Sequence, residues 1–180
     1  MRRETIIVRL TVLLTVLAVL VVSTGVSTSQ PAKRVTIVGL PPYEFGAPME
    51  VILKANPTLQ QVPPNWVGVL TYRGRFEFYI PGTISVYFWE QKLVYIWISW
   101  LRLRDYEVKF MYQSIIDSYD LTVMNVTHHF VNPAGAVLAF EDVEGSRLDF
   151  SGIAGSSTGG ELRYQWGAFR KANVPLAPRF

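Results

Sequence analysis

The hydrophobic pattern divides the chain into two parts near residue 28. Residues 10–22 form an almost unbroken apolar run, preceded by a short basic region and followed by small residues. This layout predicts a secretory signal peptide over residues 1–27, cut before Thr28. The alternative is a retained membrane anchor, because residues 6–22 approach the minimum length that crosses a bilayer. Both interpretations predict an N-terminal hydrophobic helix and place the rest of the chain outside the cytoplasm.

After a small, polar linker at residues 28–33, short apolar stretches alternate with turn residues along residues 34–180. Between Arg75 and Ile80, for example, polar and apolar side chains alternate as in a half-buried strand. Nine or ten such stretches predict one all-β domain, a β-sandwich or jelly roll. The predicted strands are 34–40, 49–55, 67–72, 75–80, 84–89, 93–102, 106–112, 121–130, 136–140 and 148–153, with turns at 73–74 and 81–82. Residues 161–172 fit a strand or a short helix, and one helical turn is predicted at residues 114–119.

The predicted strand at residues 93–102 is apolar on both of its sides. A strand with one face in water alternates apolar and polar residues, so both sides of this strand must be covered. Either the strand is central and enclosed by its own domain, or one side docks on another subunit or on a membrane surface. The candidate interface residues on that side are Val94, Ile96, Ile98 and Trp100.

The composition strengthens the expectation of a covered surface. Charged residues make up 17% of the chain, where a typical soluble domain has about 25%. The net charge of +3 comes mostly from the leader, because Arg2, Arg3 and Arg9 precede or interrupt its apolar run. No basic stripe remains in residues 34–180, so we predict no nucleic-acid partner. Such a domain is expected to bury surface against copies of itself, other envelope proteins or lipid.

The chemistry-bearing residues predict neither an enzyme nor a cofactor site. The chain has no cysteine, which excludes disulfides, thiolate catalysis and cysteine-ligated metals. Residues 155–159 match the nucleophile motif G-x-S-x-G, but no histidine follows them, so a Gly/Ser-rich loop is the better interpretation. His128 and His129 are adjacent, and in a strand they point to opposite sides, which does not suit a shared metal. An acidic turn with Glu141, Asp142 and Glu144 lacks calcium-loop spacing, and we interpret it as a solvated turn.

One modification site is suggested by a short motif. Asn125, Val126 and Thr127 form an N-x-T tripeptide, which is an acceptor for an N-linked glycan on an exported chain. The alternative is that Asn125 is an ordinary strand residue.

The first strand after the linker suggests how the domain assembles. Its residues are Arg34, Val35, Thr36, Ile37, Val38, Gly39 and Leu40. If this strand left its own sheet and completed the sheet of a neighbour, subunits would join by β-strand addition. This order of parts resembles archaeal surface-filament subunits of the bundling-pilus or thread type. The resemblance implies a β-sandwich whose N-terminal strand is donated to the next subunit. The alternative is that the strand pairs within its own domain.

Three classes of function therefore remain open. The first is a structural or interaction protein of the cell surface, a subunit of a filament or envelope assembly. The second is a membrane-anchored accessory subunit of an envelope complex, which requires that the leader is retained. The third is an extracytoplasmic carbohydrate-binding module or enzyme, in which Trp66, Trp89 and Trp166 offer flat aromatic faces to a sugar.

Overall fold

The structure is a computed structural model, and it describes residues 32–78, 80–156 and 159–175. Residues Lys33–Phe180 form one compact unit, distinct from Met1–Ala32. The predicted hydrophobic leader, its cleavage site and most of the predicted linker lie outside the described residues. Among the residues described, no helix has the length and apolarity required to cross a membrane.

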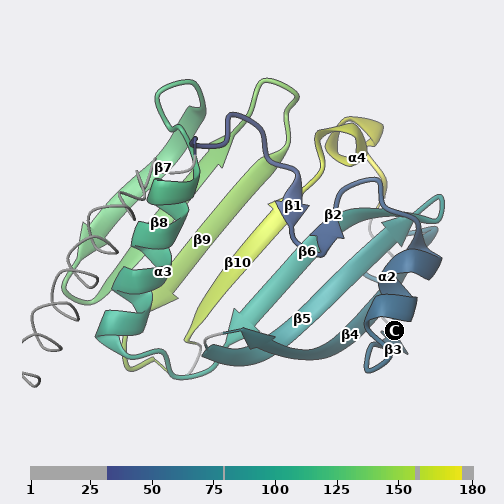
Figure 1. The fold of residues 1–180 in the computed structure, drawn as a ribbon, viewed down its shortest axis with the longest axis horizontal. Coiled ribbons are helices and arrows are strands. Elements are labelled where there is room, and N and C mark those ends of the chain that lie inside the picture. The colour runs from purple at the N-terminus through teal and green to yellow at the C-terminus, as the bar shows by residue number, and fades with distance from the viewer. Residues whose placement is uncertain (1–31, 79, 157–158, 176–180) are drawn as a thin grey trace, which may run out of the picture. The chain divides into compact units, whose positions relative to one another are not determined.

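The unit is mostly β, as predicted, and eight of its strands form a single antiparallel sheet (Figure 1). The strand order across this sheet is β3-β4-β5-β6-β10-β9-β8-β7. The bounds are β3 (Gln60–Val62), β4 (Val69–Phe78), β5 (Ile80–Trp89), β6 (Lys92–Trp100), β7 (Asn125–Asn132), β8 (Gly135–Glu141), β9 (Arg147–Ile153) and β10 (Gly160–Gln165). A separate two-stranded sheet pairs β1 (Gly39–Leu40) with β2 (Tyr43–Glu44). The strands described here do not form the two packed sheets of the predicted sandwich.

Helices cover the sheet where a second sheet was expected. Helix α3 (Asp105–Ser118) packs on β8 and β9, on the face turned toward the viewer in Figure 1. The β1–β2 hairpin lies on the same face over β10 and β6. Two shorter helices complete the unit, α2 (Met49–Ala55) and α4 (Gly167–Ala172). The result is one broad sheet that is covered in part on each of its two faces.

The strand predicted at residues 106–112 was wrong, because those residues belong to α3. Their alternation of polar and apolar side chains is short, and it fits the repeat of a strand as well as that of a helix. Val108, Met111 and Ile115 recur at helical spacing, and Val108 and Ile115 are buried against the sheet. Asp105 and Glu107 also place negative charge in the first turn, where the helix dipole favours it.

Three other local predictions were wrong, one of a strand and two of turns. Residues 49–55 form α2 and not a strand, with Pro48 at the N-cap, where a missing N–H costs nothing. The expected turn at residues 73–74 is the middle of β4, where Gly74 pairs with Ile84. Pro81 and Gly82 lie inside β5, opposite Glu77 and Phe76. By contrast, the turn between β5 and β6 is where the sequence placed it, with Glu90 and Gln91 at positive φ.

The core is divided between the two faces of the sheet. On the α3 face, residues of β5, β6, β8, β9 and β10 pack against α3 and the N-terminal segment. On the opposite face a smaller aromatic cluster forms beneath α4, around Tyr87, Val94 and Phe169. The described unit thus buries apolar side chains on both faces of its central strands, which explains their continuous hydrophobicity.

Candidate functional site

The predicted interface on β6 is enclosed by the protein's own fold, so that interpretation was wrong. Val94, Ile96 and Ile98 are fully buried and Trp100 is 4% exposed. The four residues do not share one side either. A β-bulge leaves Val94 without a partner on β5, between the pairs Phe88–Leu93 and Tyr87–Tyr95. Val94 therefore joins the cluster beneath α4, while the other three face α3.

The predicted assembly strand at residues 34–40 packs on its own domain and joins the eight-stranded sheet nowhere. Only Gly39 and Leu40 form a strand, and they pair with β2. Arg34 makes a single bridge to Tyr119 at the end of α3. Ile37 is 2% exposed, and its N–H donates to Asp142 Oδ2 at 2.7 Å. The exposed side chains of the segment are Arg34, Val35 and Val38.

The long edge of the sheet is β7, and no other strand of the described chain covers its outer side. All eight of its residues are exposed, and Phe130 is 57% exposed. Its sequence contains no Lys, Arg, Asp, Glu or Pro. Asn125, the glycosylation candidate, is exposed at the start of this strand. The opposite edge of the sheet, β3, is only three residues long.

The two histidines lie on opposite faces of β7, as their adjacency predicted. His129 pairs with the buried Leu138 on the α3 face, and it contacts the hydroxyl of Tyr112 through Nε2. His128 pairs with Ala139 on the other face. No cluster of three or more His, Asp or Glu side chains suited to a metal occurs among the residues described.

The acidic turn is solvated only at Val143 and Glu144, while Glu141 and Asp142 are structural elements of the domain. Asp142 is 7% exposed, and its Oδ1 accepts the backbone N–H groups of Glu144 and Ser146. Glu141 pairs with Arg170 of α4 at 2.7 Å and with Arg147 of β9 at 3.2 Å. These contacts engage the carboxylates of Glu141 and Asp142, two of the three acids that were candidates for calcium.

The other sequence candidates give no site. Gly155 and Gly159 have positive φ and belong to the loop after β9, while Ser157 and Thr158 lie outside the described residues. The three tryptophans proposed for sugar binding gather beside α4 and pack against other rings. Trp66 meets Tyr87 and Tyr95 edge to face, at centroid distances of 5.3 and 5.5 Å. All three side chains are partly buried in this cluster, where they serve as packing residues.

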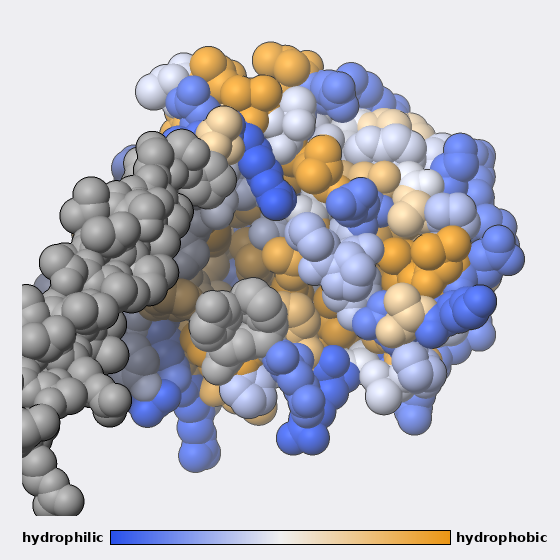
Figure 2. Space-filling model, viewed as in Figure 1, coloured by the Kyte–Doolittle hydropathy of each residue, from blue (hydrophilic) through white to orange (hydrophobic). Residues whose placement is uncertain are grey.

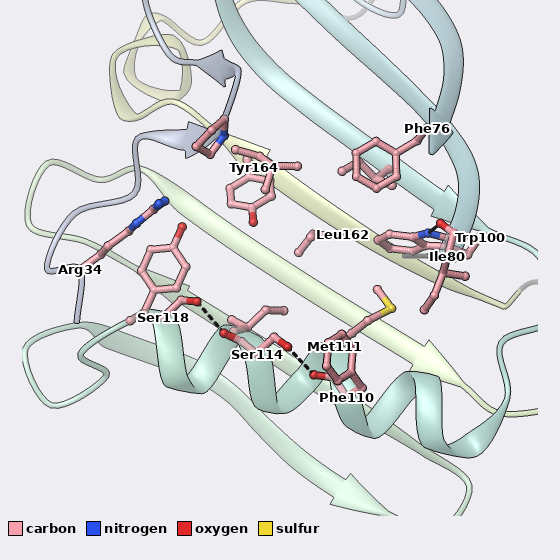
Figure 3. Close-up of a pocket in the computed structure, with 15 residues that line it drawn as sticks. Arg34, Phe76, Ile80, Trp100, Phe110, Met111, Ser114, Ser118, Leu162 and Tyr164 are labelled. Atoms are coloured by element: carbon pink, nitrogen blue, oxygen red, sulfur yellow. Dashed lines mark hydrogen bonds between the residues drawn. The ribbon is translucent and has the colours of Figure 1, made fainter. Parts of the chain in front are cut away.

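A pocket of about 360 Å³ lies between α3 and the sheet. Figure 2 shows apolar residues in the middle of this face of the domain and also at its upper rim, with hydrophilic residues at the right and lower edges. The pocket runs from Arg34 and Tyr164 at one end to Phe76, Ile80 and Trp100 at the other (Figure 3). Met111 and Ser114 line it from the helix. Its size falls in the range of small-molecule sites, at the lower end.

The polar groups of this pocket gather at one end. Tyr119 and Tyr164 are 3% and 4% exposed, and burial raises the pKa of both hydroxyls. The Arg34 guanidinium lies close enough to lower the pKa of Tyr119 in part, through its charge and a hydrogen bond. Both hydroxyls therefore stay protonated at neutral pH. They hydrogen-bond each other, with Tyr164 donating to Tyr119, so the Tyr119 hydroxyl is the one that can donate to a ligand.

Sequence reasoning missed the pocket. Its lining residues come from the N-terminal segment, β4, β5, β6, α3 and β10, so no local motif joins them. The one usable signal was the helical spacing of Val108, Met111 and Ile115, which identifies the helix that forms one wall. No family model, curated protein or solved structure matches the chain.

Proposed function

We propose that this protein is a structural, non-enzymatic subunit of an extracytoplasmic assembly that joins a second copy of itself by β-strand addition at β7. The observation that carries the proposal is the outer edge of β7, which is long, fully exposed and without charge. The location outside the cytoplasm rests on the hydrophobic leader.

An edge of this kind is uncommon in a protein that stays alone. Soluble proteins protect sheet edges with charged side chains, proline, bulges that turn the edge away or very short strands. The opposite edge follows this rule through the shortness of β3. The β7 edge carries a bulge near Thr127 but none of the other protections, and it exposes Val126, Phe130 and Val131. An added strand would satisfy its outer backbone groups and cover these side chains.

The residues of β7 also suit pairing with their own copy. Because β7 contains a bulge, we count positions along its partner β8. His129 pairs with Leu138, and Val126 and Val131 pair with Phe140 and Ala136, which lie at equal steps on either side of Leu138. Asn125 and Asn132 stand at equal steps further out. A two-fold axis through His129 therefore places valine opposite valine and asparagine opposite asparagine. This symmetry is what an isologous antiparallel pair requires.

Donation of residues 34–40 is the other route to strand addition, and it is the one that the filament resemblance implies. It requires Ile37 to leave the core and Asp142 to lose a hydrogen bond. Pairing through β7 needs no such rearrangement. The β7 edge is for this reason the route that the geometry favours.

Single cysteines test the register directly, because the natural chain has none. In the full chain, His129→Cys is expected to give a disulfide-linked dimer on mild oxidation. Residues at the two-fold axis of an antiparallel pair lie about 4.5–5.5 Å apart between Cα atoms, within disulfide range. His128→Cys is the matched control, since its expected neighbour is Phe130 of the other copy and not itself.

A second control and a second measurement keep the test decisive. Val143→Cys, on a side chain that is 85% exposed, is expected to stay monomeric under the same oxidation. Sedimentation of the unmodified protein is expected to show a dimer that His129→Asp converts to monomer. The proposal would be overturned if the wild-type chain were monomeric and His129→Cys formed no more disulfide-linked dimer than Val143→Cys. Cross-linking from β7 to a different protein alone would favour the accessory-subunit alternative and would also overturn self-pairing.

A further inference from the structure

The pocket beneath α3 has the polarity of a site for an amphipathic molecule. Its far end is built from aromatic and aliphatic side chains, Phe76, Ile80, Trp100 and Met111. Trp100 keeps its own indole N–H satisfied, donating to the Ile80 carbonyl at 3.0 Å, so it presents apolar surface to the space. A ligand group at this end must therefore be apolar.

The two serines of the helix wall do not change this character. Ser114 Oγ donates to the Phe110 carbonyl at 2.8 Å, and Ser118 Oγ donates to the Ser114 carbonyl at 2.6 Å (Figure 3). Their hydrogens are used within α3, and the wall offers mainly carbon to the pocket. Polar recognition is left to the opposite end.

That end carries a positive charge without a counter-ion. No carboxylate of the described residues forms an ion pair with Arg34, whereas two arginines of the neighbouring strands β9 and β10 are paired. Arg147 pairs with Asp149 at 2.7 Å, and Arg163 pairs with Glu161. Two acids lie near Tyr119. Asp142 accepts three backbone N–H groups, and Asp120 accepts the N–H and hydroxyl of Thr122. An anion at this end would meet the guanidinium of Arg34 and the neutral hydroxyl of Tyr119.

We infer that the pocket binds a single-chain carboxylate of the fatty-acid type, with the carboxylate at Arg34 and Tyr119 and the hydrocarbon chain running toward Trp100. A guanidinium and a phenol hydroxyl match the acceptors of a carboxylate. The volume of about 360 Å³ suits one chain better than the two chains of a diacyl lipid. This site lies on the α3 face of the sheet and does not depend on pairing at β7.

Tryptophan fluorescence can test both the occupancy and the orientation. Of the five tryptophans, four belong to the cluster beneath α4, and Trp100 faces the pocket. A decanoate carrying bromine on its last carbon is expected to quench part of the emission of the full chain in lipid nanodiscs, and to do so saturably. Trp100→Phe is expected to remove that component, because bromine quenches only the indole that it contacts.

Head-group recognition is tested by one substitution and two probes. Arg34→Gln is expected to weaken binding of the brominated acid about tenfold, which is the usual cost of a lost charge-assisted hydrogen bond. Binding of the corresponding brominated alcohol is expected to stay unchanged. Arg34 is exposed, so this variant should fold as the natural chain does.

A pair of neighbouring helix positions tests the cavity itself. Ser114→Phe is expected to fill the pocket and abolish quenching, while Gln113→Phe, on a residue that does not line the pocket, is expected to retain it. Wild-type protein that shows no saturable quenching would overturn the inference. Equal affinity of wild type and Arg34→Gln for the acid would overturn the carboxylate assignment.

Discussion

Asp142 connects three parts of the domain through one carboxylate. One oxygen accepts the N–H of Ile37 at 2.7 Å, and the other accepts the N–H groups of Glu144 and Ser146 at 3.0 and 2.9 Å. The side chain thereby fixes the turn between β8 and β9 and holds the N-terminal segment on the sheet. Buried N–H groups that lose a charged acceptor are costly, because water cannot replace it.

Asp142→Ala is therefore expected to destabilise the fold by about 3 kcal/mol, as three charge-assisted hydrogen bonds are lost. Denaturant unfolding of the full chain measures this change. The matched control is the next residue, Val143→Ala. Its side chain is 85% exposed, and a change within about 0.5 kcal/mol is expected. Equal stability of the Asp142→Ala and Val143→Ala variants would contradict the structural role of the carboxylate.

The sequence predicted the position of this turn but not the role of its residues. Asp142 and Ile37 are separated by 105 residues, so the hydrogen bond between them has no local signal. Sequence reasoning treated the acids as solvated because charged turn residues usually are. It missed the site at Arg34 because the neighbours of Arg34 are distant in sequence: Tyr119 follows α3, and Tyr164 belongs to β10.

At the scale of elements, prediction succeeded where both the length and the residue types pointed to strands. The strands β6, β8 and β9 were found because each is rich in β-branched, aromatic or alternating residues between clear turns. It failed at α2 and α3, whose short apolar patterns fit the repeat of a strand and the repeat of a helix equally well. It also failed at the bulge beside Val94, because an extra residue reverses the side of a strand without leaving a mark in the sequence.

Glu141 joins two strands to a helix, and its pKa makes the link sensitive to pH. Hydrogen bonding from Arg170, and then from Arg147, holds the pKa of this carboxyl below its ordinary value. A lowered pKa means that the stabilisation is complete above the unfolded value of about 4.3 and is lost as the pH falls through the folded value. Glu141→Gln is expected to cost about 1 kcal/mol at neutral pH.

The difference between wild type and Glu141→Gln is expected to shrink below about pH 4. Denaturant unfolding at several pH values measures it. Glu77→Gln is the control, because Glu77 and its partner Arg75 are 68% and 75% exposed and such pairs contribute little. A stability difference for Glu141→Gln that stayed constant down to pH 3 would contradict the assigned cause.

At the scale of the whole molecule, the predicted leader implies that residues 34–180 lie outside the cytoplasm. We expect Val143→Cys in the full chain to react with a membrane-impermeant maleimide on intact cells, since the side chain is 85% exposed. Thr5→Cys, placed before the apolar run, is the matched control. It is expected to be absent from the mature protein if the leader is cut, and unreactive before lysis if the leader is an anchor. Labelling of Val143→Cys only after lysis would refute the extracytoplasmic location.

The shortness of β3 limits how far association by sheet edges can proceed. A pair joined symmetrically through β7 has used the long uncharged edge of each copy. What remains at both outer ends is the three-residue β3 and, beside it, the end of β4, whose exposed Arg75 and Glu77 disfavour the addition of another strand. Growth through this edge therefore terminates at two copies, and an endless fibre would need a different contact.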